Sequence, residues 1–122
     1  MLFEESQPGL IIIRYREKAD LEVERQGALL ARLEAVAGPV VLIFDVAAEI
    51  RMVPMDVPNF WLGVTGRAEL LIKGMAIVTS SAAVRVAAGG FSLANTARGI
   101  STEVKTVGSV EAATDWARAL LS

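Results

Sequence analysis

The stretch VVLIFD, residues 40–45, decides the fold class of this chain. Its first five residues are apolar on both sides of an extended backbone, and the run ends in Asp45. A strand of this kind lies in the middle of a parallel sheet that helices cover on both faces. The exit from such a strand is where open α/β proteins usually place ligands and reacting groups. Asp45 and the residues after it are therefore the first candidates for a functional site.

Segments on either side of this strand show alternating strand and helix patterns. The turn residues Gln7-Pro8-Gly9 predict an opening hairpin. In the rest of the chain, β-strand patterns alternate with segments in which apolar residues recur every three or four residues, and these predict the remaining strands and helices. The expected strands are 2–6, 10–16, 40–45, 75–79 and 102–107, and the expected helices are 20–37, 57–71, 82–97 and a last one after Ser109.

Several helix boundaries follow from capping residues. Asp20, Asp56 and Ser109 are the expected N-caps of their helices. Gly89-Gly90 interrupts the helical pattern of 82–97, so we expect that helix to bend or to split. In the last helix, the apolar stripe is expected to consist of Ala112, Trp116, Ala119 and Leu120.

The element order ββαβαβαβα predicts one α/β domain over residues 1–122. Alternating strands and helices require a mostly parallel sheet of about five strands with helices on both faces and right-handed crossovers. The opening hairpin adds one antiparallel strand. Segment 102–107 alternates in polarity and is expected near a sheet edge.

Composition excludes several classes of chemistry. The chain has no cysteine and no histidine, which removes disulfides, zinc sites, thiol nucleophiles and the imidazole base. We expect no cofactor and no metal site. The net charge of −2 does not indicate the basic surface that nucleic-acid-binding proteins use, so we expect no nucleic-acid partner. The chain begins with acids and has no apolar run of about 20 residues, so we expect no transmembrane segment and a cytoplasmic location.

The whole pattern resembles the STAS-domain superfamily, and within it the SpoIIAA-like branch of bacterial anti-sigma-factor antagonists. The likeness covers nearly the whole chain and is carried by loose hydrophobic motifs. These are the hairpin into LIIIRYR (10–16), the central VVLIFDV (40–46), MAIVTS (75–80), AAVRVAAGGF (82–91) and the closing TEVKTV (102–107) with VEAATDWA (110–117).

The resemblance implies a regulatory protein-interaction module. In the antagonists, a partner kinase phosphorylates a serine at the start of the helix after the central strand, because a phosphate there switches docking. The corresponding neighbourhood here contains Ala47 and Ala48, with no hydroxyl before Thr65. The switch position is therefore expected to be unoccupied.

Two strand exits carry polar candidates with two interpretations each. Asp45 could orient a partner or hold a cation, or it could accept backbone N–H bonds in an Asx-type turn. Ser80 and Ser81 follow Thr79 and could bind an anion at the next helix N-terminus, or serve as its N-cap. A serine nucleophile is excluded, since no histidine or G-x-S-x-G motif is present.

Aromatic and glycine residues have interpretations of the same kind. Phe60, Trp61 and Trp116 could line an apolar cavity or fill the core. Gly89-Gly90 could open a pocket or permit close packing. The stretch IRMVPMDVPNFWL (50–62) has little charge, and with Met52 and Met55 it is the best candidate for an exposed apolar patch that contacts a partner or membrane.

Three functions follow as hypotheses. The first is a non-enzymatic STAS-like module that binds a protein partner, or forms a homodimer, through 47–66. The second is a sensor or carrier of a small apolar or lipid-like ligand held by Phe60, Trp61, Phe91 and Trp116. The third, an enzyme using Asp45 and Glu49 on one helical face, is the least favoured because the usual catalytic residues are missing. We adopt the first as our prediction.

Overall fold

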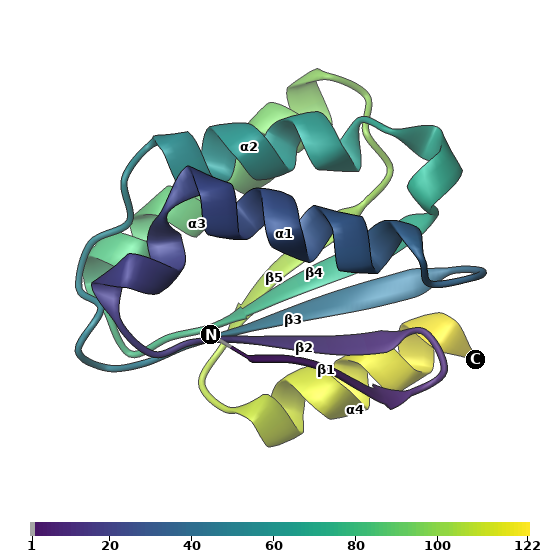
Figure 1. The fold of residues 1–122 in the computed structure, drawn as a ribbon, viewed down its shortest axis with the longest axis horizontal. Coiled ribbons are helices and arrows are strands. Elements are labelled where there is room, and N and C mark those ends of the chain that lie inside the picture. The colour runs from purple at the N-terminus through teal and green to yellow at the C-terminus, as the bar shows by residue number, and fades with distance from the viewer. Residues whose placement is uncertain (1) are drawn as a thin grey trace.

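The computed structural model describes residues 2–122, with only the backbone described at Leu2. Its centre is a five-stranded sheet with the order β1-β2-β3-β4-β5 (Figure 1). β1 runs antiparallel to β2, and every later neighbour is parallel, so the predicted hairpin and mixed sheet are confirmed. The strands are β1 (Leu2–Gln7), β2 (Leu10–Tyr15), β3 (Val40–Val46), β4 (Ile72–Val78) and β5 (Glu103–Val107).

The helices divide unequally between the two faces of the sheet. α1, α2 and α3 cover one face, and α4 lies across the other (Figure 1). Strands that follow sequence order and are joined by crossovers of one hand place all their helices on one side. Only α4, which follows the last strand, reaches the opposite face. The helices are α1 (Val23–Glu34), α2 (Asp56–Thr65), α3 (Ala82–Ala97) and α4 (Val110–Leu121), with short 3-10 turns η1 (Lys18–Leu21) and η2 (Ala68–Leu70).

β3 divides the apolar core into two clusters. Leu42 and Phe44 belong to the cluster under α1, α2 and α3, while Val41 and Ile43 belong to the cluster under α4. All four side chains are buried. The apolar run 40–45 therefore forms a central strand buried on both faces, as predicted.

The expected helix 20–37 is shorter than the pattern suggests. Asp20 lies in η1 and not at an N-cap, because its carboxylate accepts the backbone N–H groups of Arg16 and Glu17. α1 begins only at Val23, after Glu22. The helix ends at Glu34, and its buried face includes Leu29 and Leu33 as expected.

The expected helix 57–71 ends early. α2 stops at Thr65, before Gly66. Asp56 is the first residue of the helix and not its N-cap; the N-cap is Met55, whose side chain makes no capping hydrogen bond. The chain then turns through η2 to Leu71, which has a left-handed backbone (φ 52°) and is half exposed. β4 consequently begins at Ile72, before the expected start at residue 75, and it includes Lys73 and Gly74.

Gly89 and Gly90 do not interrupt α3, which runs for 16 residues as one α-helix. Both glycines are exposed, and a Cβ added to either would meet nothing within 4 Å. Neither the expected bend nor the expected close packing occurs. The helix is held by its other face, where Ala88 and Phe91 are buried.

α4 packs through Trp116 and Leu120 of the predicted stripe and through two alanines outside it. Ala113 and Ala117 are fully buried, whereas Ala112 and Ala119 are exposed. Ser109 caps the helix as predicted, since its Oγ accepts the N–H of Ala112 at 3.1 Å.

Candidate functional site

The carboxyl ends of the parallel strands meet at one end of the sheet, where the sequence predicted a site. Ligand crevices in open α/β sheets form where the strand order reverses. Among residues 2–122, the strands follow one another in sequence order. This end therefore lacks the crevice of a doubly wound sheet, and its chemistry rests on the side chains themselves.

Asp45 is held by two arginines and not by a turn. Its Oδ2 lies 2.9 Å from Arg16 Nη2 and 3.8 Å from Arg14 Nε. The Asx-type turn expected for this acid is therefore wrong. The ion pairs join β3 to β2 and its exit, which gives Asp45 a clear structural role.

Ala47 and Ala48 do not lie at a helix start. The N–H of Ala47 donates to the Tyr15 carbonyl at 2.9 Å, and the Ala47 carbonyl accepts the N–H of Ile50 at 3.0 Å. A turn and an extended loop follow, and α2 begins only at Asp56. Asp45 and Glu49 therefore share no helical face, which corrects the geometry assumed for a pair of catalytic carboxylates.

Ser81 is the N-cap of α3. Its Oγ accepts the N–H of Val84 at 3.3 Å and donates to the Arg51 carbonyl at 2.9 Å. Thr79 supports the same corner, since its Oγ1 accepts the N–H of Ser81 at 3.0 Å. The capping interpretation is confirmed for Ser81, whereas Ser80 is exposed.

A buried polar network lies beneath α1 and α2. The Gln26 Oε1 accepts the Tyr15 hydroxyl and, at 3.2 Å, the Trp61 indole N–H. The Gln26 amide donates to the carbonyls of Asp20 at 2.6 Å and Glu22 at 3.3 Å. Gln26 is fully buried, and these partners use both ends of its amide.

Ionisation of this region is set by burial and by hydrogen bonds. Burial raises the pKa of the Tyr15 hydroxyl far above its ordinary value, so Tyr15 is a neutral donor. Burial would also raise the pKa of Asp20. The groups that donate to its carboxylate, among them the Arg16 and Glu17 N–H groups, outweigh that effect and hold the pKa below its ordinary value of 3.8.

This network is not among the features predicted above, although the sequence carries one signal for it. Gln26 precedes Leu29 by three residues and Leu33 by seven, so it occupies the apolar face of α1. A polar residue in that register needs internal partners. Nothing in the sequence identifies Tyr15 and Trp61 as those partners, because they come from β2 and α2.

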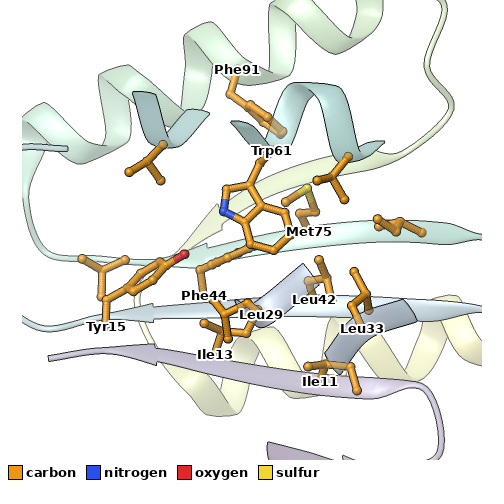
Figure 2. Packing of buried hydrophobic residues seen from close by; sticks show 14 of the residues in the cluster. Ile11, Ile13, Tyr15, Leu29, Leu33, Leu42, Phe44, Trp61, Met75 and Phe91 are labelled. Carbon is orange, nitrogen blue, oxygen red and sulfur yellow. The ribbon is translucent and has the colours of Figure 1, made fainter. Parts of the chain in front are cut away.

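An apolar cavity of about 80 Å³ lies next to the network, between the sheet and helices α2 and α3. It is partly open to solvent. Figure 2 shows Trp61 between Phe91 and Phe44, with the Tyr15 hydroxyl turned toward the indole nitrogen. The residues that line the cavity come from β2, η1, β3, the loop before α2, α2, β4 and α3. They are Tyr15, Leu21, Phe44, Val46, Val53, Val57, Pro58, Trp61, Met75, Ile77, Val84, Ala87, Ala88 and Phe91.

The four aromatic residues expected around one cavity do not meet. Trp61 and Phe91 line it, and Phe60 stacks edge-on against Trp61 at 5.4 Å between ring centroids. Trp116 packs with the cluster under α4, on the opposite face of the sheet. The strand pattern could not assign α4 to a face, because a terminal helix has no following strand.

The expected apolar patch at 50–62 is exposed only in part. Met52 and Met55 are 76% and 66% exposed. Ile50, Val57 and Trp61 are buried, and Trp61 has only 3% of its surface exposed. The exposed methionines belong to residues 51–55, which we call the methionine loop, and Val53 of this loop lines the cavity.

Comparison of the chain with family models, curated proteins and solved structures found no match. Within residues 2–122, no helix combines the length and the apolar character needed to cross a bilayer. The same residues contain no cluster of three or more carboxylates suited to a metal ion.

Proposed function

We propose that this chain is a non-enzymatic interaction module of STAS-like type. Its protein partner docks on the methionine loop and places one apolar side chain in the cavity. The observation that carries the proposal is the joint position of an open apolar cavity and two exposed methionines in the loop that borders it. Interface hot spots are commonly apolar anchors that fill a pocket of this kind.

The size of the cavity favours a side chain over a free ligand. Drug-sized ligands occupy pockets of about 300–1,000 Å³. The present cavity, at about 80 Å³, has room for a few heavy atoms. One leucine or methionine tip from a partner has the right scale, and the unbranched side chains of Met52 and Met55 can adapt to the surface around it.

The chemistry next to the cavity favours binding over catalysis. Gln26 is fully engaged in holding Tyr15 and Trp61, and Tyr15 stays protonated over the physiological pH range. Asp45 is paired with Arg16. These groups fix the shape of the cavity wall and leave its interior apolar.

The resemblance to anti-sigma-factor antagonists supports a protein as the partner. The residues at the start of α2, Met55, Asp56 and Val57, carry no hydroxyl. Docking here would therefore not be switched by phosphorylation at that helix start.

Site-specific photo-crosslinking tests this function. A photoreactive residue at position 55, introduced in cells of the source organism, should give a covalent adduct with one partner protein. The same residue at position 71, which is also exposed but lies after α2 at the end of η2, is the matched control. The adduct at position 55 should disappear when Ala88→Val fills the cavity. Equal adducts at both positions, or none at position 55, would contradict the proposal.

The alternative is a sensor of a very small apolar molecule, and the apolar cavity wall is the observation that favours it. An apolar cavity of about 150 Å³ can hold benzene, so this one would accept only a smaller group. Native mass spectrometry of freshly purified protein distinguishes the two. A mass increment that Ala88→Val removes would favour the ligand, and the unmodified chain mass would favour the protein partner.

A further inference from the structure

The two edges of the sheet differ in a way that points to self-association through β5. β1 carries Glu4 and Glu5 and has a register irregularity between Glu5 and Gln7, features that discourage pairing with another strand. β5 is regular over its whole length and pairs with β4 alone among residues 2–122. Its sequence, EVKTV, places Glu103 and Lys105 on the same side of the strand, two residues apart.

The backbone of β5 has identifiable groups turned away from β4. The Val107 carbonyl accepts the N–H of Thr79, so Val107 directs its backbone groups toward β4. Backbone orientation alternates along a strand in a ladder. Glu103 and Lys105 therefore share the orientation of Val107, while Val104 and Thr106 direct their N–H and C=O groups outward.

There is open space beside this edge. A groove of about 430 Å³ runs along residues 100–105, bordered by Ser92 and Thr96 of α3 on one face and by Trp116 of α4 on the other. The two α3 side chains at this border, Ser92 and Thr96, are small and leave room for a strand to approach.

We propose that the occupant of this groove is β5 of a second copy of the chain, paired antiparallel so that two sheets form one continuous sheet. The outward groups of Val104 and Thr106 allow a two-fold axis at residue 104, 105 or 106. An axis at Lys105 would place two lysines directly opposite each other. An axis at Val104 places Glu103 opposite Lys105 of the second copy, twice.

That register makes the charges of β5 complementary to themselves. Glu103 and Lys105 then occupy non-hydrogen-bonded pairs, in which side chains approach most closely, with Cα atoms about 4.5 Å apart. Opposite charges at such positions stabilise strand pairing, and like charges oppose it. This inference concerns a different surface from the methionine loop and does not rest on the proposed function.

Charge exchange tests the register by analytical ultracentrifugation over a range of protein concentrations. The chain of 13.0 kDa should sediment as a dimer at high concentration. Glu103→Lys alone and Lys105→Glu alone should each give a monomer, because each places like charges opposite each other. The double variant Glu103→Lys with Lys105→Glu should dimerise again.

Mixing the two single variants gives the sharpest result. One copy then carries lysine at both positions and the other carries glutamate at both, so every facing pair is opposite in charge. The mixture should form a heterodimer although each variant alone is monomeric. Unchanged circular dichroism shows that the variants fold. A monomeric unaltered chain at all concentrations, a dimer insensitive to both single variants, or binding of extended peptides without self-association would each overturn the inference.

Discussion

The two faces of the sheet are packed by different means, although the same strands supply both. Under α4 the core is closed by small residues, since Ala113 and Ala117 are fully buried and Gly74 lies against the side chains of Leu120 and Trp116. Under α1, α2 and α3 the core contains large aromatic rings, a buried polar network and an open cavity. The difference shows where this fold can accept a foreign group.

The buried network gives the largest predicted difference between the faces. Gln26→Leu leaves three buried groups without their partner: the Tyr15 hydroxyl, the Trp61 N–H and the Asp20 carbonyl. The Glu22 carbonyl keeps the backbone N–H groups of Arg25 and Gln26. Each such buried group costs about 1–3 kcal/mol, so the three together should lower the free energy of unfolding by about 3 kcal/mol or more.

Urea unfolding measures this loss, with Thr114→Val on α4 as the matched variant. Thr114 donates only to the Val110 carbonyl of its own helix, and its replacement should cost about 1 kcal/mol or less. Equal losses of stability at both positions would show that the network does not stabilise the face under α1, α2 and α3 more than an ordinary hydrogen bond would.

Adding the same two methyl groups to each core distinguishes the faces more finely. Ala117→Val enlarges a side chain that is fully buried under α4, and overpacking should cost about 1–3 kcal/mol. Ala88→Val extends into the cavity, so its cost should stay below about 1 kcal/mol, mostly from the lower helix propensity of valine. Thermal unfolding of both variants provides the comparison, and a larger loss for Ala88→Val would contradict the open cavity.

Two glycines should respond in opposite directions to the same substitution. A Cβ at Gly74 would lie 2.6 Å from Leu120 Cδ1 and 2.8 Å from Trp116 Cη2. Because side-chain atoms can give way, Gly74→Ala should destabilise the protein by about 1–2 kcal/mol. Gly89→Ala meets no atom and should stabilise α3 by about 0.5–1 kcal/mol. Chemical denaturation reports both signs, and stabilisation by Gly74→Ala would refute close packing under α4.

The smallest predicted effect is a pH dependence of stability that arises on the face covered by α1, α2 and α3. The pKa of Asp20 is lower in the folded chain than its ordinary value of 3.8, so its carboxylate stabilises the fold above about pH 4. This contribution is lost as the pH falls through the folded-state pKa. Asp20→Asn should therefore lower the urea midpoint at about pH 7 and differ less from the unaltered chain at about pH 3. A gap that widens on acidification would reverse the assigned sign.

The strand pattern predicts the sheet well, because the apolar run 40–44 is typical of a strand buried on both faces and the hairpin follows from Gln7-Pro8-Gly9. Helix ends are less predictable. Asp20 has the residue type of an N-cap, but tertiary donors at Arg16 and Glu17 hold it in η1. Gly89 and Gly90 are poor helix formers, yet the buried face of α3 keeps the helix intact.

The candidate site was predictable in position but not in composition. Met52 and Met55 are exposed, as expected for the apolar patch predicted at 50–62, whereas Trp61 of the same stretch is a core residue. Cavities arise where side chains from several elements fail to fill space, and no single segment encodes that. The partnership of Gln26 with Tyr15 and Trp61 likewise depends on three elements meeting.

Methyl NMR under xenon pressure tests most directly whether the two faces differ as described. Xenon enters empty apolar cavities. We expect concentration-dependent shifts of the methyl signals of Met75 and Ala88, which line the cavity, and unchanged signals from Ala113 and Ala117 under α4. Ala88→Val should abolish the Met75 shift. Shifts of equal size on both faces, or none at Met75 and Ala88, would contradict the central claim that only the three-helix face can receive an apolar group.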